Sequence, residues 1–255
     1  MGVAAYLDQT EYFNDTEFAK QNGEADWTSA TPKYWPLQST LDLVVWSPYQ
    51  NNTENNKVIT LNVDNSTKHV LADQVDYLYG AAYYTEGKQE DAVNVILTHA
   101  LAKVTIKFRC ENNVNVTVNS VALVAPTLKG TCSVSYKNDK TADTPSWDNL
   151  VSENGDWSLT WTSKQITNTI TNDTQGIIKS YDEVSVMVVP TSASNIKFEY
   201  VIDGMPATDA VIDLNNVVWD GGKHYVYAIE ITPLEIKFTP SVTEWEDGGT
   251  TTEEL

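Results

Sequence analysis

Histidines and carboxylates are the residues of this sequence that could carry acid–base or metal chemistry. The three histidines are His69, His99 and His224, and no two are spaced as ligands of one zinc ion. A glycosidase needs two carboxylates about 5–9.5 Å apart, but chance pairs are common among 35 acidic residues. No nucleophile elbow, phosphate loop, dinucleotide fingerprint or EF-hand loop occurs. The sequence therefore predicts no catalytic, cofactor or metal site, and we expect a protein that is not an enzyme.

Tryptophans offer a different kind of site. Trp147, Trp157 and Trp161 lie in a polar segment, and a row of indoles on a β-sheet can stack sugar rings. Trp157 and Trp161 share the alternation phase of Leu159, which favours packing in a core instead. We interpret all three as core residues, while two exposed and coplanar indoles would favour a sugar-binding platform.

The stretch from Val93 to Arg109 changes its alternation midway. Apolar residues fall on odd positions up to Leu97 and on even positions from Ala100 onward. Because side chains alternate between sheet faces, this slip moves the buried set to the opposite face. Either the strand carries a bulge, or the chain leaves one β-sandwich and enters another. We favour the crossing, and we interpret His99, at the switch, as a packed imidazole bonded to a backbone carbonyl.

The remaining chain reads as short alternating strands separated by Gly, Pro and Asn turns, which indicates an all-β sandwich architecture. One helical turn is expected at 15–21. We expect an N-terminal domain at 1–91, which looks at least one strand short of a closed sandwich. A C-terminal domain is expected at 92–245, followed by an acidic, disordered tail at 246–255.

Charge and composition exclude several classes of partner. The 255-residue chain has a formal net charge of -19, which repels nucleic acids and anionic lipids. No apolar run is long enough to cross a bilayer, and Met1 leads straight into a strand-like segment. We therefore expect that an export signal has been removed upstream. Cys110 and Cys132 could form a disulfide or stay as two buried thiols, and the sequence leaves this open.

Four motifs in order resemble those of the fimbrillins, the subunits of type V pili in Gram-negative gut and oral anaerobes. The central one is T-H-A-L-A-K-V-T-I, beginning at Thr98. Upstream lie Y-W-P-L-Q-S-T-L-D-L-V-V-W-S-P-Y from Tyr34 and D-Y-L-Y-G from Asp76. Downstream, G-G-K-H-Y-V-Y-A-I-E-I begins at Gly221, and S-V-T-E-W follows it and ends at Trp245. The motifs span nearly the whole chain.

The resemblance implies two tandem transthyretin-like sandwiches, the N-terminal one truncated, in a subunit that joins other pilin subunits by strand exchange. It implies export as a lipoprotein to the outer-membrane surface, and no cofactor. In fimbrillins, proteolysis removes the first N-terminal strand, and the vacated groove accepts an extended segment from the next subunit. Such head-to-tail contacts build filaments.

The chain departs from the stalk-pilin pattern after Trp245, where a polar, acidic tail replaces an apolar donor segment. Either the donor is the earlier strand, with Leu234, Ile236, Phe238 and Val242, or this subunit accepts a strand and gives none. The second case describes a tip or minor subunit that mediates adhesion to a host or bacterial surface glycan or protein. The alternatives are a surface carbohydrate-binding sandwich without polymerisation and, third, a hydrolase that lacks any motif.

Overall fold

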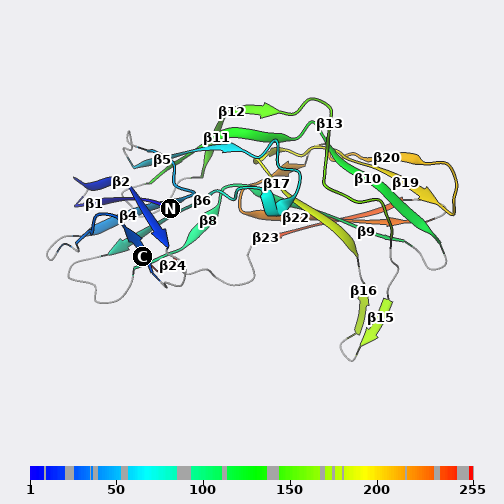
Figure 1. The fold of residues 1–255 in the computed structure, drawn as a ribbon, viewed down its shortest axis with the longest axis horizontal. Coiled ribbons are helices and arrows are strands. Elements are labelled where there is room, and N and C mark those ends of the chain that lie inside the picture. Colours follow the sequence, from blue (N-terminus) through cyan, green and yellow to red (C-terminus); the bar gives the residue numbers. More distant parts are fainter. Residues whose placement is uncertain are drawn as a thin grey trace.

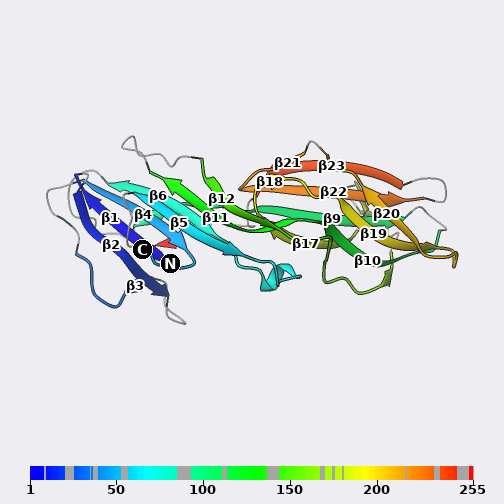
Figure 2. The same ribbon diagram turned by 90° about the horizontal axis from the view of Figure 1, so that it is seen from above.

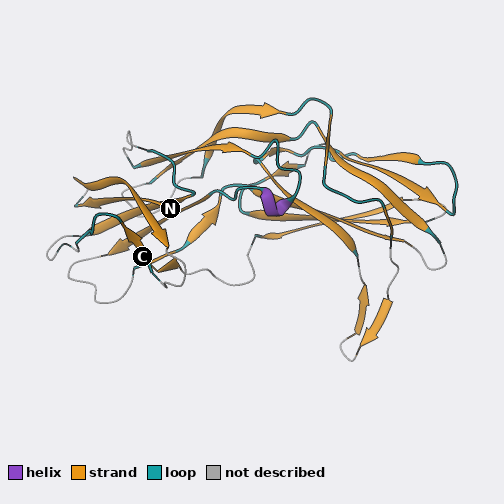
Figure 3. Ribbon diagram, viewed as in Figure 1, coloured by secondary structure: helices purple, strands orange, loops and turns teal. Residues whose placement is uncertain are grey.

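The computed structural model is an elongated, almost entirely β molecule with two lobes placed end to end (Figures 1 and 2). Helical structure among the described residues is limited to the short 3-10 turn η1 (Leu71–Asp73) (Figure 3). No helix within these residues is long and apolar enough to cross a bilayer. The structure describes residues 1–8, 10–20, 26–34, 36, 40–52, 57–84, 93–110, 114–136, 144–166, 170–173, 176–179, 181–215, 217–232, 236–245 and 253–254.

A six-stranded sheet forms the base of the first lobe. Its central strands are apolar on both faces because each face packs against a separate core. Its strands in spatial order are β3 (Trp27–Ser29), β2 (Thr10–Lys20), β1 (Gly2–Leu7), β4 (Leu41–Ser47), β6 (Leu78–Tyr84) and β8 (Leu97–His99). The helical turn expected at 15–21 is wrong, because residues 15–20 belong to β2 and pair with β1 and β3.

A three-stranded sheet covers one face of this base. It contains β12 (Ser146–Ser152), β11 (Thr127–Ser135) and β5 (Val58–Asp64), with β11 in the middle. The core between the two sheets includes the fully buried Trp46, Leu61 and Cys132. β11 and β12 come from the segment that the predicted boundary at residue 91 assigns to the C-terminal domain. The strand pairing therefore crosses that boundary, and the division into domains stays a prediction.

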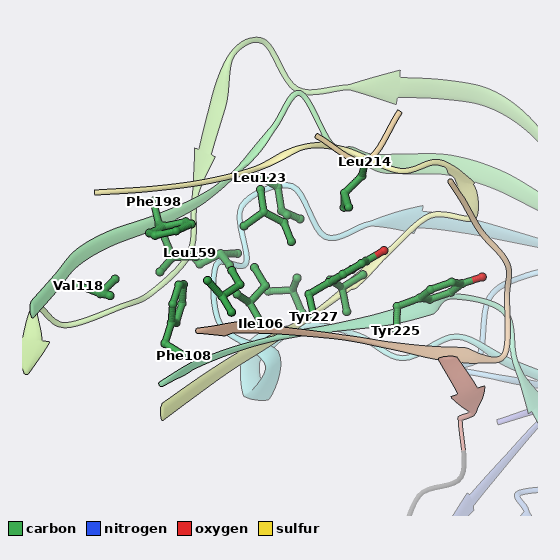
Figure 4. Close-up of a cluster of buried hydrophobic side chains, with 14 of the residues drawn as sticks. Ile106, Phe108, Val118, Leu123, Leu159, Phe198, Leu214, Tyr225 and Tyr227 are labelled. Carbon is green, nitrogen blue, oxygen red and sulfur yellow. The ribbon is translucent and has the colours of Figure 1, made fainter. Parts of the chain in front are cut away.

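The second lobe is a sandwich of a four-stranded and a five-stranded sheet that share one core. Phe108, Phe198 and Tyr227 are almost fully buried between them, and Phe108 meets Phe198 edge to face (Figure 4). One sheet orders β17 (Asp182–Val188), β9 (Ala102–Cys110), β22 (Lys223–Ile231) and β23 (Ile236–Glu244). The other orders β13 (Asp156–Ser158), β10 (Val116–Val124), β19 (Ile196–Ile202) and β20 (Thr208–Ile212), with β14 (Lys164–Gln165) also paired to β10.

Three small ladders complete the described strands. The pair β15 (Ile170–Asp173) and β16 (Gly176–Lys179) projects from the second lobe (Figure 1). β18 (Thr191–Ser192) pairs with β21 (Val218–Trp219). β24 (Glu253–Glu254) pairs with β7 (Asn94–Val95), which brings the end of the chain back to the first lobe.

The chain passes from one lobe to the other between β8 and β9. β8 ends at His99 in the six-stranded sheet, and β9 begins at Ala102 in a different sheet. Val93 and Val95 pack in a core of the first lobe, whereas Val104 and Ile106 pack in the core of the second. The change of alternation in the sequence therefore marks a crossing between sheets rather than a bulge within one strand.

Candidate functional site

Residues from distant segments meet where β8 ends and β9 begins. Nδ1 of His99 lies 2.7 Å from Oδ2 of Asp76. The imidazole stacks on the indole of Trp245, with 3.9 Å between ring centroids and 8° between planes. Gly222 lies against the short connection between β8 and β9, and its N–H donates to the Leu101 carbonyl. We call Asp76, His99, Gly222 and Trp245 the motif junction, because each belongs to one of the sequence motifs described above.

Main-chain hydrogen bonds hold the motif junction closed. The N–H of Trp245 donates to the carbonyl of Gly222 over 2.8 Å, and the N–H of Gly222 donates to Leu101 over 2.9 Å. On the other side, the N–H of Ala100 donates to Tyr77 over 2.7 Å. We call residues 100–101, between β8 and β9, the crossing segment. The hydrogen bonds join the end of β23 to the crossing segment through Gly222, and they join the crossing segment to the first lobe.

The glycine pair of the downstream motif is required by close packing at this point. A Cβ atom on Gly221 would lie 2.6 Å from the carbonyl oxygen of Ala100, closer than real Cβ contacts come. Gly222 has a φ of +71°, a backbone conformation that favours glycine. The G-G of G-G-K-H-Y therefore lets the turn pass directly against the crossing segment.

The Trp245 ring has polar side chains as neighbours. His99 stacks on the indole, and Nζ of Lys103 lies 5.8 Å from its centroid. The residue is only 8% exposed. Stacking and cation–π contacts of this kind stabilise a buried aromatic ring. His99 is thus a packed imidazole whose Nδ1 meets the carboxylate of Asp76, and a bond from this ring to a backbone carbonyl stays a prediction.

The described residues contain no group of three or more His, Cys, Asp or Glu side chains that could hold a metal ion. Burial lowers the pKa of His224, and the neighbouring Lys103 and Lys107 lower it further. Its Nε2 lies 2.8 Å from the hydroxyl oxygen of Thr105, on the face of the second-lobe sheet that points away from the core. The arrangement at the motif junction ties chain segments of the two lobes together.

A family model described as fimbrillin-like matches residues 2–245. The chain belongs to the fimbrillin-like family. This is a family of structural fimbrial subunits rather than enzymes, and it supports a role as a pilus subunit at the cell surface. No curated protein matches the sequence.

Solved structures share the fold of this fimbrillin at low sequence identity. A fimbrial protein from Bacteroides vulgatus is 14% identical with a TM-score of 0.60, covering 96% of this chain and 92% of its own. A cell adhesion protein from Bacteroides ovatus is 14% identical with a TM-score of 0.58, and the match covers 97% of this chain and 88% of that protein. A second cell adhesion protein, from Bacteroides uniformis, is 16% identical with a TM-score of 0.54, and the match covers 96% of this chain and 91% of that protein.

The three tryptophans singled out in the sequence do not form one surface. Trp157 is 5% exposed, and its Nε1 donates to the carbonyl of Ser66 over 2.9 Å. Trp161 packs against the same second-lobe core, and its Nε1 donates to Val118 over 3.0 Å. Trp147 packs against the first-lobe core. The structure therefore brings Trp157 and Trp161 to one core and Trp147 to another, and glycan stacking on these indoles stays a prediction.

The predicted donor strand is an edge strand of this fimbrillin. β23 pairs in register with β22 along its whole length, and among the described strands β22 is its only neighbour in that sheet (Figure 1). Ile236 and Phe238 pack partly against the core, whereas Val242 is 54% exposed. Leu234 lies outside the described residues. A donor role for these residues stays a prediction.

β1 is the strand whose position the sequence did not reveal. It lies inside the six-stranded sheet, paired with β2 on one side and with β4 on the other. Val3 and Ala5 enter one core of the first lobe, while Ala4 and Tyr6 enter the other. A Cβ on Gly2 would lie 2.1 Å from the buried Trp46 ring. The first strand of the chain is therefore buried from Gly2 to Tyr6, and three of these five residues are Gly or Ala.

The two cysteines are free and buried in different cores. Cys110 lies in the second lobe, and Cys132 lies in the first. Burial raises the pKa of the Cys132 thiol to about 12 and also raises that of Cys110. Both therefore behave as small apolar side chains rather than as nucleophiles or a bridge.

Proposed function

We propose that this fimbrillin is a structural and adhesive subunit of a cell-surface pilus that is assembled by strand exchange. The observation that carries the proposal is the position of β1. It is the first strand in the sequence, it is held between β2 and β4, and its side chains fill both first-lobe cores. Its removal would leave two rows of unpaired main-chain groups beside an apolar slot, which an extended segment of another subunit could fill.

The slot left by β1 would select a donor with small residues. Gly2 lies against Trp46, and Ala4 and Ala5 are completely buried. β23 of this chain carries large side chains at Ile236 and Phe238, together with Pro240, which has no N–H to donate. β23 is therefore a poor fit to the slot of an identical subunit. This mismatch supports a tip or minor subunit that accepts a strand from a different pilin.

The location and partners follow from this role. We propose that the chain is exported as a lipoprotein precursor and placed in a fimbria on the outer-membrane surface. Its partners are other pilin subunits and a host or bacterial surface glycan or protein. The net charge of -19 keeps the free subunit soluble and opposes contact with anionic headgroups.

Protease trimming of the purified protein tests the assembly role. After limited digestion that removes β1, we expect the chain to remain monomeric, because its own β23 fits the vacated slot poorly. Size-exclusion chromatography and negative-stain microscopy provide the readouts. A stalk pilin treated in the same way is the control and should polymerise. Filaments formed by this chain alone would contradict the tip or minor assignment.

Glycan binding without polymerisation is a second candidate function. A polar cavity of about 320 Å³ favours it, because hydroxyl and amide groups can bond to sugar hydroxyls. Its polar lining includes Thr127, Ser152, Ser192, Asn195 and Asn215. A glycan array separates the two candidates: specific binding by a chain that never accepts a donor strand would favour the second.

A further inference from the structure

An apolar cavity opens on the other side of the first-lobe sheet, away from the three-stranded sheet. Its volume is about 360 Å³, which lies at the lower end of the range for small-molecule sites. Val3, Leu41 and Leu43 form part of the floor and are each at most 5% exposed. The floor is therefore set by interior strands of the sheet and does not depend on loops.

The walls of this cavity are mainly aromatic. Phe13 and Phe18 come from β2, and Trp27 comes from β3. Tyr34 lies at the mouth, where its carbonyl accepts a hydrogen bond of 2.8 Å from the hydroxyl of Tyr12. Aromatic rings prefer edge-to-face or offset contact with other rings. The walls therefore suit a flat, aromatic occupant.

Among the described residues, the charged side chain that lines the cavity is a cation, Lys33. Nζ of Lys33 lies 4.9 Å from the centroid of the Phe13 ring. Lys33 forms no ion pair within the described part of the chain. An ammonium group at the mouth of an apolar cavity attracts an anion there. The sequence holds 35 acidic and 16 basic residues, so a cavity lined by a cation contrasts with the acidic balance of the whole chain.

We propose that this cavity binds a small aromatic carboxylate, with its ring between Phe13, Phe18 and Trp27 and its carboxylate on Lys33. A polypeptide strand is a poorer fit, because the floor strands β1 and β4 are hydrogen-bonded on both sides and offer no free main-chain edge. A free small molecule needs only the apolar walls and the cation. The inference does not rest on the pilus role, but because Val3 of β1 forms part of the floor, it applies to the chain that retains β1.

Indole-3-acetate is the probe for a titration of the full chain by isothermal calorimetry. Wild-type protein should bind it saturably at one site. Indole-3-acetamide, which lacks the charge, should bind about tenfold more weakly, and hexanoate, which lacks the ring, should also bind more weakly. Lys33→Gln should weaken indole-3-acetate by about tenfold. The matched control Lys129→Gln removes a lysine that pairs with Asp64 elsewhere and should leave affinity unchanged.

A filling variant tests the location of the site independently of charge. Ser29 is half-buried in the cavity wall, so Ser29→Phe should abolish binding, while circular dichroism and thermal melting report that the fold is retained. The proposal is overturned if wild-type protein shows no saturable binding. It is also overturned if the acetamide or hexanoate binds as tightly as indole-3-acetate, or if Lys33→Gln has no effect.

Discussion

Replacing Trp245 by alanine is expected to lower the free energy of unfolding by about 3–5 kcal/mol, as other buried Trp-to-Ala changes do. The indole is 8% exposed, stacks on His99 and lies below Lys103. Its loss would leave a cavity in the first-lobe core and remove the side chain that fixes the chain directly after β23. Urea denaturation followed by circular dichroism measures the change.

Trp245→Phe is the matched control, because a smaller ring can keep the stack on His99. We expect it to lose much less stability than the alanine variant. A further comparison is Trp147→Ala, which removes an indole from a half-buried position on β12 and should cost less. Equal stability of Trp245→Ala and the wild type would show that the motif junction does not hold the C-terminal segment.

Replacing Gly2 by valine is expected to lower the free energy required to detach β1 from its sheet by about 3 kcal/mol, the upper end of the usual cost of overpacking. A Cβ atom here would lie 2.1 Å from Cε2 of Trp46, and that ring is fully buried and cannot move aside. Amide hydrogens of β1 should therefore exchange about a hundredfold faster than in the wild type. Hydrogen exchange with mass spectrometry resolves this segment.

Thr10→Val serves as the control for Gly2→Val, because Thr10 is exposed on the adjacent β2 and its replacement should change exchange very little. The second lobe gives an internal control, since β9 and β22 should keep their protection in both variants. Uniform acceleration across both lobes would indicate global unfolding, and unchanged exchange in β1 would contradict the close fit at Gly2.

The change of lobe could be read from the sequence because alternation reports which face of a sheet is buried. The slip between Leu97 and Ala100 appears in the structure as the end of β8 and the start of β9. The all-β class was likewise predictable from short alternating segments. Both features depend on residues that are neighbours in the sequence.

Features that depend on distant residues could not be predicted in this way. The alternation at Cys132 and Val134 predicts a strand, but nothing local indicates that β11 returns to the first lobe and pairs with β5. The sequence predicts one helical turn at 15–21, whereas pairing with β1 and β3 makes residues 15–20 part of a strand. Tertiary pairing decided the structure at both places.

The candidate sites likewise combine features that the sequence shows with features that only the fold shows. The motifs identified His99 and Trp245 as notable, yet only the fold shows that these rings stack and that Asp76 bonds to the imidazole. The aromatic cavity was missed, because Phe13, Trp27 and Lys33 are unremarkable in the sequence and converge only when β2 and β3 lie over the floor strands. No local signal in the sequence identifies that convergence.

Exchange of β1 is the most direct test of the proposed strand slot. A protease site placed between β1 and β2 would let the folded full chain be nicked and mixed with an excess of labelled peptide M-G-V-A-A-Y-L-D. We predict that the labelled peptide replaces the resident strand at one copy per chain and that a peptide with valine at the position of Gly2 does not. Failure of the nicked chain to take up either peptide, or equal uptake of both, would contradict the account.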